Sequence, residues 1–198
     1  MKKYLRSCQS EFWQDVFKRE TEYLVRALKG YKDILSVGCG PAIVERGLQE
    51  NGFNVIGLDV SEDALEEASD SIRTVVGSAE KMEFNDATFD AAIYVVSLQF
   101  IDDYKKAIQE TARVLKPNGK LVVMLLNPLS EFFEVKGKQT GSYVSQIKHP
   151  YLAPIEKIIR GHFAVDKAEY RLGIRNKRIF DSQNPSLAAL YIIQGTKS

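Results

Sequence analysis

The sequence of 198 residues has few cysteines, no long apolar run and almost no net charge. Its two cysteines, Cys8 and Cys39, lie far apart, which excludes a disulfide scaffold and predicts a reducing, cytoplasmic location. No stretch approaches the roughly 18 apolar residues of a membrane span, and no apolar segment of a signal peptide follows the N-terminal lysines. A net charge of +1 gives no bulk attraction to nucleic acid or membranes, so a soluble globular protein without membrane contact is expected.

Apolar residues recur with two different periods along most of the chain. Residues 3–28 show helical spacing and predict an N-terminal helix. Strands are expected at residues 34–37, 54–59, 74–77, 91–96 and 120–126, and helices between them at about 42–51, 62–71 and 102–115. The strand runs are apolar on both faces, which is typical of a parallel sheet covered by helices. The alternation of strands and helices therefore predicts a doubly wound α/β fold.

The pattern changes after residue 127. Residues 129–150 are polar and contain turn residues, which predicts an insertion or lid, and residues 116–119, Lys-Pro-Asn-Gly, predict a turn before the last central strand. A short helix is expected at residues 154–160. Residues 163–172 and 187–196 alternate and predict two strands that lie antiparallel to one another.

The stretch ILSVGCGPAIVERG, residues 34–47, leads an apolar strand through a Gly-Cys-Gly turn into a helical pattern. Gly38 and Gly40 lack Cβ, so the chain can bend sharply and a ligand can approach the backbone. About 20 residues further on, Asp59 ends the next strand, where an acidic side chain can bind both hydroxyls of a ribose. A tight turn with an incidental aspartate is the simpler alternative. The position of both features at strand ends favours an adenosine-bearing cofactor.

The dinucleotide fingerprint G-x-G-x-x-G is incomplete in this turn. Its third glycine would stand at residue 43, which is Ile43. A bulky side chain at the start of the helix suits a nucleoside without phosphates better than a pyrophosphate. The motif therefore disfavours an NAD-dependent oxidoreductase, which shares the predicted fold.

Residues 30–126 resemble the class I S-adenosylmethionine-dependent methyltransferases in four successive blocks. The blocks are SVGCGPA, VIGLDVSEDALEEA, GSAEKMEFNDATFDAAI and VVSLQFIDDYKKAIQETARVLKPNGKLVVM. The resemblance implies a Rossmann-like sheet, mainly parallel with an antiparallel C-terminal strand and with helices on both faces. It also implies S-adenosyl-L-methionine as cofactor, S-adenosyl-L-homocysteine as product, and no metal. The chain would then be one methyltransferase domain, 1–198, with a helical cap (1–30), a cofactor-binding core (30–126), a lid (127–160) and C-terminal strands (161–198).

The sequence departs from this family at three positions. Ser36 stands where the first motif is acidic, and the resemblance implies that the acid helps to hold the methionine ammonium group. Ala42 replaces the third glycine of that motif and is expected to be tolerated with a negative φ. Ser78 stands where many members have an aspartate facing the adenine amino group, and a serine hydroxyl can still accept that hydrogen bond.

The resemblance also assigns roles to individual residues. It implies cofactor contacts by Gly38, Cys39, Gly40, Asp59, Val60, Ser78, Ala79, Ser97 and Leu98. The first three would lie under the methionine portion, with Cys39 as a small packed residue rather than a reactive thiol. Asp59 would bind the ribose, and Val60 would cover one face of the adenine. Gln99, Phe100 and Tyr143 are expected on the substrate side.

A general base is needed only for an acceptor whose nucleophilic atom carries a proton of high pKa. His149 in the expected lid is the candidate, and an ordinary loop histidine is the alternative. On the N-terminal helix, Tyr4, Phe12, Trp13 and Tyr23 are expected either to pack in the core or to contact cofactor or substrate.

The predicted activity is SN2 transfer of a methyl group to a small-molecule acceptor. The alternatives are an RNA or protein methyltransferase, a non-catalytic protein that binds S-adenosylmethionine, and an oxidoreductase. The sequence SLQF at residues 97–100 argues against the amino-group DNA methyltransferases, which carry an Asn-Pro-Pro-Tyr type motif there. Arg171, Arg175, Lys177 and Arg178 form a basic cluster that could meet RNA, but a solvated hairpin loop is the favoured interpretation, so a nucleic-acid partner is not expected.

Overall fold

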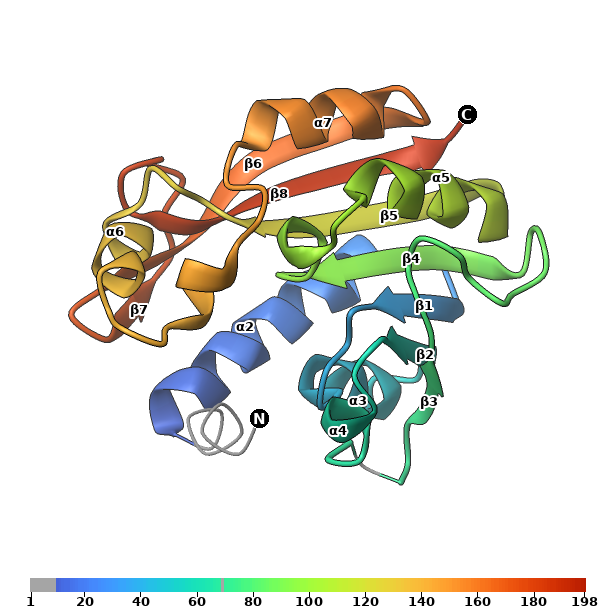
Figure 1. Ribbon diagram of the computed structural model, residues 1–198, viewed down its shortest axis with the longest axis horizontal. Helices are drawn as coiled ribbons and strands as arrows, with labels where there is room; N and C mark the ends of the chain where they lie inside the picture. Colours follow the sequence, from blue (N-terminus) through green and yellow to red (C-terminus); the bar gives the residue numbers. More distant parts are fainter. Residues whose placement is uncertain (1–9, 69) are drawn as a thin grey trace.

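An eight-stranded sheet runs through the part of the chain that the computed structural model describes, residues 10–68 and 70–198 (Figure 1). Its strands are β1 (Asp33–Val37), β2 (Asn54–Asp59), β3 (Arg73–Val76), β4 (Phe89–Val95), β5 (Leu115–Leu126), β6 (Phe163–Arg175), β7 (Arg178–Phe180) and β8 (Ala188–Lys197). The order is β3-β2-β1-β4-β5-β8-β6-β7. Neighbouring strands from β3 to β5 pair in parallel, and β8 pairs antiparallel with both β5 and β6. The predicted mainly parallel sheet with an antiparallel C-terminal part is confirmed.

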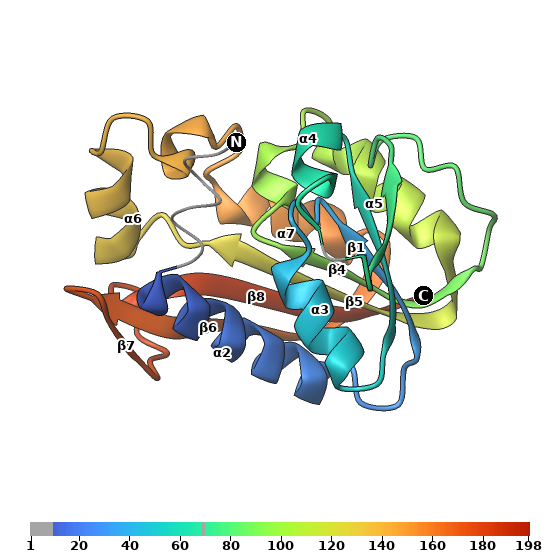
Figure 2. The ribbon, with the colours of Figure 1, turned by 90° about the horizontal axis from the view of Figure 1, so that it is seen from below.

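Helices cover both faces of this sheet, as Figure 2 shows. Helices α2 (Glu11–Ala27) and α3 (Ile43–Glu50) pack on one face, and α5 (Tyr104–Val114) and α7 (Leu152–Arg160) pack on the other. Successive residues of β1 serve both sides, because Ile34 packs with α2 and α3 while Leu35 packs with α5 and α7. This is why the strands are apolar on both faces.

The described part of the N-terminal helix predicted at residues 3–28 is α2, which covers Glu11–Ala27. Residues 1–9, which include Tyr4 and Cys8, lie outside the described residues. The buried positions of α2 are Val16, Glu20 and Leu24, spaced by four residues along one face. A glutamate therefore stands in the middle of the apolar stripe that faces the sheet.

The helix predicted at residues 62–71 is also shorter, because α4 covers only Glu62–Leu65. Its first turn forms as expected, with the Ser61 side chain accepting a hydrogen bond from the backbone N–H of Ala64. The segment beyond Leu65 is rich in Ser and Asp, which favour turns over helix interiors, and the structure has turns there. Residue 69 lies outside the described part.

The turn predicted at residues 116–119 is built into a strand instead. Helix α5 ends at Val114, and β5 begins at Leu115, directly before the Lys-Pro-Asn-Gly sequence. Phe89 pairs with Leu115, but Ala91 pairs with Lys120, so the extra residues form an irregularity in the ladder between β4 and β5. Pro117 prevents the helix from continuing, because proline lacks the N–H that the helix would need.

The segment between residues 127 and 160 contains α6 (Glu131–Gly137), the 3-10 helix η2 (Tyr143–Gln146) and α7. The two predicted C-terminal strands form and lie antiparallel. Their connection contains β7, a strand that the sequence did not predict, which closes a hairpin with β6. Asn176 and Lys177 at its tip both have positive φ, which gives the turn a twist that matches the two strands. No helix within the described residues is long and apolar enough to span a membrane.

Candidate functional site

The glycine turn and Asp59 lie side by side because of the register between two parallel strands. Val37 pairs with Leu58, so the residues that follow each of them leave the sheet together. The backbone N–H of Gly38 donates to the carbonyl of Leu58 at 2.7 Å. Asp59 Oδ2 accepts from the Gly40 N–H at 2.8 Å, and Oδ1 accepts from the Ser61 N–H at 2.9 Å. Asp59 therefore fixes the turn, and each of its oxygens keeps a further lone pair for a ligand.

Backbone conformation explains the first glycine of the turn and corrects the expectation for Ala42. Gly38 has φ +73°, and a Cβ placed on it would lie 2.5 Å from the Cβ of Ser97. Ala42 was expected to be tolerated if its φ is negative, but its φ is +54°. The left-handed conformation carries a cost for alanine that the family's glycine would avoid. Ala42 is buried as the N-cap of α3, where the fold holds it in this conformation.

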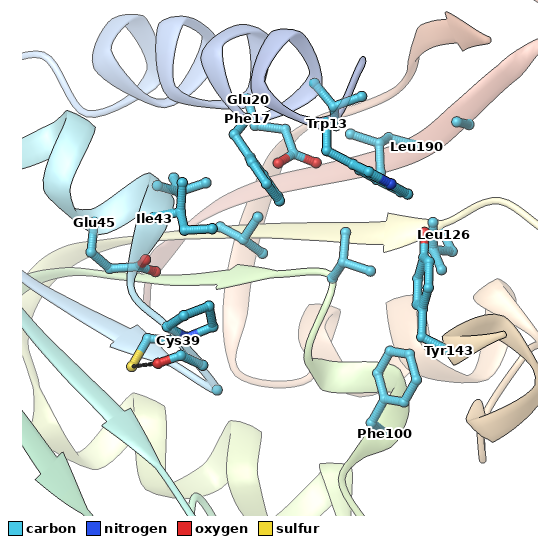
Figure 3. Close-up of a pocket in the computed structure, with 18 of the residues that line it drawn as sticks. Trp13, Phe17, Glu20, Cys39, Ile43, Glu45, Phe100, Leu126, Tyr143 and Leu190 are labelled. Atoms are coloured by element: carbon cyan, nitrogen blue, oxygen red, sulfur yellow. Dashed lines mark hydrogen bonds between the residues drawn. The ribbon is translucent and has the colours of Figure 1, made fainter. Parts of the chain in front are cut away.

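A cavity of about 320 Å³ opens next to this turn (Figure 3). This volume lies in the range of small-molecule sites. Six regions of the chain line it. They are the turn with Asp59 and α3 (Gly38, Cys39, Gly40, Pro41, Ile43, Val44, Glu45), the start of α4 (Ser61, Ala64), helix α2 (Trp13, Val16, Phe17, Glu20), the segment after β4 (Phe100), the segment of α6 and η2 (Phe132, Tyr143), and the strand ends (Val95, Val96, Leu126, Leu172, Ile174, Ala189, Leu190).

Aromatic side chains form one wall of the cavity. The ring of Trp13 lies 6.1 Å from that of Phe17 and 6.3 Å from that of Phe132, between ring centres. Tyr143 contacts the same indole edge-on at 6.0 Å. Trp13 thus joins α2 to α6 and η2. The sequence analysis offered core packing or a place at the ligand site for the aromatic residues of this helix, and Trp13 meets the structural conditions for both. It packs in an aromatic cluster and it lines the cavity.

Two buried carboxyl groups face the cavity, and sequence analysis missed both. Glu20 is 5% exposed and Glu45 is 2% exposed. The hydroxyl of Ser36 donates to Glu45 Oε1 at 2.5 Å, so a carboxyl group from α3 stands beside the serine that replaces the family's acid. Burial raises the pKa of Glu45 to about 7, and burial together with repulsion by Glu45 raises the pKa of Glu20 to about 8. The position of Glu20 within the apolar stripe of α2 was a sequence signal that could have identified it.

The raised pKa of Glu20 predicts a stability that depends on pH. Between the pKa of an unfolded glutamate and about pH 8, the folded chain holds a proton that the unfolded chain lacks. The free energy of unfolding contributed by this group is therefore full at low pH and is lost as pH rises toward about 8. Glu20→Gln is expected to stabilise the free protein by about 1–2 kcal/mol at about pH 8 and little at about pH 5. Urea unfolding at both pH values measures this, with Glu22→Gln on the exposed side of α2 as the control. Equal changes at the two pH values would contradict it.

The end of β4 contributes different residues to the cavity from those expected. Val95 and Val96 line it, whereas Ser97 and Leu98 do not. The Ser97 hydroxyl donates to the Val37 carbonyl and ties β4 to β1, and Leu98 is buried in the core. Val96 has φ +52°, which is a strained conformation for a β-branched residue. This conformation changes the direction of the chain where it passes the cavity wall. The cofactor contacts expected of Ser97 and Leu98 remain predictions.

Val60, Ser78 and Ala79 lie outside the set of residues that line the cavity. The side chain of Val60 follows Asp59 and is 77% exposed, which leaves it available to a flat ligand. The Ser78 hydroxyl accepts from the Glu80 N–H in its own loop, and Ala79 packs against the core. The adenine contacts expected of these three residues stay predictions.

Of the three residues expected on the substrate side, Phe100 and Tyr143 line the cavity and Gln99 does not. Gln99 is fully buried, and its side-chain amide both donates to the Leu126 carbonyl and accepts from the Leu126 N–H. Its backbone carbonyl accepts from the N–H groups of Lys148 and His149. Gln99 thus holds the end of β5 and the loop after η2 together.

His149 does not line the cavity either. Its Nε2 lies 3.0 Å from the carbonyl oxygen of Ile101 and 3.1 Å from that of Asp102, and its ring packs edge-on against Tyr104. Because carbonyl oxygens only accept hydrogen bonds, Nε2 carries the proton in this arrangement. The ring anchors a loop, which favours the structural alternative over a general base.

Replacing His149 by alanine is expected to leave cofactor affinity nearly unchanged, because the ring touches no residue of the glycine turn. Calorimetric titration of the variant with S-adenosylhomocysteine measures this. A loss of affinity of more than about threefold, well beyond the small effects typical of surface positions, would show that the loop holding the histidine helps to form the cofactor site.

Cys39 occupies a packed position in the structure. The Cys39 thiol lies against the backbone of Gly57, and burial raises its pKa, so it is a packed residue rather than a reactive nucleophile.

In the basic cluster, Arg171 pairs with Glu169 and Asp181, and Arg175 pairs with Glu131 of α6. Pairing within the chain favours the hairpin interpretation over an RNA-binding surface.

Comparisons with known proteins identify a methyltransferase domain within the chain. The family model described as a methyltransferase domain matches residues 35–123. The chain is 33% identical over 98 residues to a sterol 4-C-methyltransferase of Caenorhabditis elegans, which is 45% of this chain and 29% of that protein. It is 25% identical over 187 residues to a ubiquinone/menaquinone biosynthesis C-methyltransferase of Rickettsia prowazekii, which is 87% of this chain and 69% of that protein. The chain spans about half the length of several other curated relatives.

The fold is also found among solved structures. A S-adenosylmethionine-dependent methyltransferase of Thermotoga maritima, described as a possible histamine N-methyltransferase, superposes with a TM-score of 0.76 at 20% identity. The match covers 100% of this chain and 95% of that one, which shows a shared fold. The matched methyltransferase domain at residues 35–123 and the Rossmann-like sheet make the chain similar to the class I S-adenosylmethionine-dependent methyltransferases.

Proposed function

We propose that this protein transfers a methyl group from S-adenosylmethionine to a small, largely apolar acceptor. One observation carries the proposal: a single cavity joins the glycine turn and Asp59 to the aromatic wall around Trp13. A cofactor site and an acceptor site must share such a space for direct transfer between them. The whole chain then acts as one domain, in which residues 127–160 form the lid over the cavity and supply Phe132 and Tyr143.

The residues of the turn fit the cofactor. The absence of a side chain at Gly40, with no atom within 4 Å of a Cβ built there, leaves room for a ligand against the backbone. Asp59 accepts charge-assisted hydrogen bonds from the ribose hydroxyls, and the exposed Val60 covers the adenine. Gly38 and Gly40 lie under the methionine portion.

The bound cofactor supplies a methyl group on a sulfonium sulfur. The neutral thioether that remains after transfer is a good leaving group. The protein's task is to align the acceptor atom with that methyl and to exclude water. Phe100, Leu126 and Leu190 provide apolar walls for this purpose, together with the rings of α2 and α6. Sterols and quinones, the compound classes in the names of two relatives, have apolar rings of the kind that these walls accommodate. We infer an acceptor with such a ring.

Calorimetric titration with S-adenosylmethionine, S-adenosylhomocysteine and NADH tests the proposal. We expect micromolar binding of the first two and none of NADH. Formation of S-adenosylhomocysteine is then measured with phenolic, quinol and sterol acceptors, and at least one of these classes should be methylated. Binding of NADH alone would refute the methyltransferase function. Cofactor binding without turnover on any acceptor would favour a non-catalytic protein.

A further inference from the structure

Gln99 forms hydrogen bonds at both ends of the first part of the lid, residues 127–147. Its side-chain Oε1 accepts from the backbone N–H of Leu126 at 2.7 Å, and its Nε2 donates to the Leu126 carbonyl at 3.2 Å. Its backbone carbonyl accepts from the N–H groups of Lys148 and His149, both at 3.1 Å. One buried residue of the 3-10 helix η1 (Leu98–Phe100) therefore contacts the point where the lid leaves the sheet and the point where it returns.

The side chain of Gln99 takes the place of a strand residue at the end of β5. The N–H of Asn127 donates to the carbonyl of Ala189 in β8, so the N–H and carbonyl of the preceding Leu126 point to the other side of β5. The neighbour on that side is β4, which ends at Val95, and no described residue of β4 pairs with Leu126. A side-chain amide carries a donor and an acceptor like a peptide group, so Gln99 extends the ladder by one step.

The part of the lid between these two contacts carries aromatic residues of the cavity wall. Phe132 of α6 and Tyr143 of η2 line the cavity, and Phe100, which also lines it, follows Gln99 directly in the chain. In Figure 3, Phe100 and Tyr143 lie together at the end of the cavity away from Cys39. The position of this wall therefore depends on a residue that does not itself line the cavity.

The two ends of this part of the lid are held differently. At its beginning, the side chain of Asn127 also donates to carbonyl groups within residues 185–188. At its end, the hydrogen bonds that the structure describes for Lys148 and His149 all join residues 99–102. Loss of the contacts of Gln99 should therefore release mainly the returning end, which follows η2.

We propose that Gln99 is a positioning residue for the acceptor. By joining the two ends of residues 127–147, it fixes the aromatic residues of the lid against the indole of Trp13 and so shapes the acceptor end of the cavity. No described hydrogen bond joins Gln99 to the glycine turn or to Asp59, so cofactor binding should not depend on it. The inference rests on the proposed function for the ligand at this end, but the position of the lid can be measured without any ligand.

Trp13 is the one tryptophan of the chain, so its fluorescence reports the position of the lid. Phe132 and Tyr143 contact its indole at 6.3 and 6.0 Å between ring centres. Gln99→Met keeps an unbranched side chain of similar length and removes its donor and acceptor. We expect the emission of this variant to move to longer wavelength and its quenching by acrylamide to rise, because water reaches the indole when the lid loosens. Gln139→Met, at an exposed glutamine of the same part of the lid, is the matched control and should change neither.

Two ligands then separate the acceptor end of the cavity from the cofactor end. S-adenosylhomocysteine is the probe of the cofactor end, and 1-naphthol, a phenol with an apolar ring, is the probe of the acceptor end. Gln99→Met should weaken binding of 1-naphthol about tenfold and leave that of S-adenosylhomocysteine within about twofold. Equal losses for both ligands would mean that Gln99 supports the whole site and would overturn the proposal. Wild-type protein that binds neither ligand would refute the proposed function, and the emission of Trp13 would still decide whether Gln99 fixes the lid.

Hydrogen exchange of the wild-type protein tests the same contact if Gln99→Met does not fold. The amides of Leu126, Lys148 and His149 all donate to Gln99, so one opening of this contact should expose all three, and they should show similar protection. Fast exchange at Lys148 and His149 beside a protected Leu126 would refute the proposal. Unchanged Trp13 emission and 1-naphthol affinity in a folded Gln99→Met variant would refute it as well.

Discussion

Asp59→Ala is expected to weaken S-adenosylhomocysteine binding by about 1.5–3 kcal/mol, or about 10- to 150-fold. The carboxylate of Asp59 would lose its charge-assisted hydrogen bonds to the ribose. The structure adds a second cause, because the same side chain accepts from the N–H groups of Gly40 and Ser61. Without it, the glycine turn is no longer tied to the end of β2, and the ligand must bind a less ordered loop.

Calorimetry with two nucleosides that share the ribose, S-adenosylhomocysteine and 5′-methylthioadenosine, tests whether the loss of affinity comes from the ribose. Because the ribose is common to S-adenosylhomocysteine and 5′-methylthioadenosine, Asp59→Ala should weaken the two by similar factors. Glu62→Gln, three residues further on in the exposed first turn of α4, serves as the control. A folded Asp59→Ala variant with unchanged dissociation constants would remove Asp59 from the ribose site.

The sheet and the glycine turn were predictable because both depend on local sequence. Apolar runs on two faces indicate a covered parallel sheet, and in such a sheet Gly38 and Asp59 must meet at the carboxyl edge. The direction of the parallel strands and the positions of the glycines in the sequence were enough to place Gly38 and Asp59 together at this edge. The lengths of the helices were less predictable, because Ser and Asp after Leu65 compete with the helix for backbone hydrogen bonds.

The remaining parts of the site depend on tertiary contacts that no local pattern records. Ser36 and Glu45 are nine residues apart on a strand and a helix, and only the turn between them brings the hydroxyl and the carboxyl group to 2.5 Å. His149 and Gln99 lie in segments that the sequence analysis placed near a substrate, yet backbone groups of other segments form hydrogen bonds with their polar side-chain atoms. Leu172 and Leu190 reach the cavity from the C-terminal strands, outside the family's motifs.

Gly38→Ala is expected to destabilise the protein by about 3 kcal/mol and to lower its melting temperature by roughly 6–12 °C. Two separate costs add at this position. Alanine at φ +73° costs about 1–2 kcal/mol, and its Cβ would overlap the Cβ of Ser97, which the backbone must move to avoid. Gly40→Ala is the matched control, because its φ is +53° and no atom lies within 4 Å of its Cβ. It should cost only about 1 kcal/mol.

The double variant Gly38→Ala with Ser97→Gly distinguishes the two costs at Gly38. Removing the Ser97 side chain removes the overlap but also the hydrogen bond to the carbonyl of Val37, while the φ of residue 38 stays unfavourable. A double-mutant cycle should therefore show a favourable coupling of about 1–2 kcal/mol between the positions in thermal or urea unfolding. Additive effects, or equal costs for Gly38→Ala and Gly40→Ala, would mean that the contact with Ser97 adds nothing to the cost. The left-handed conformation of residue 38 would then be the one structural reason for the glycine.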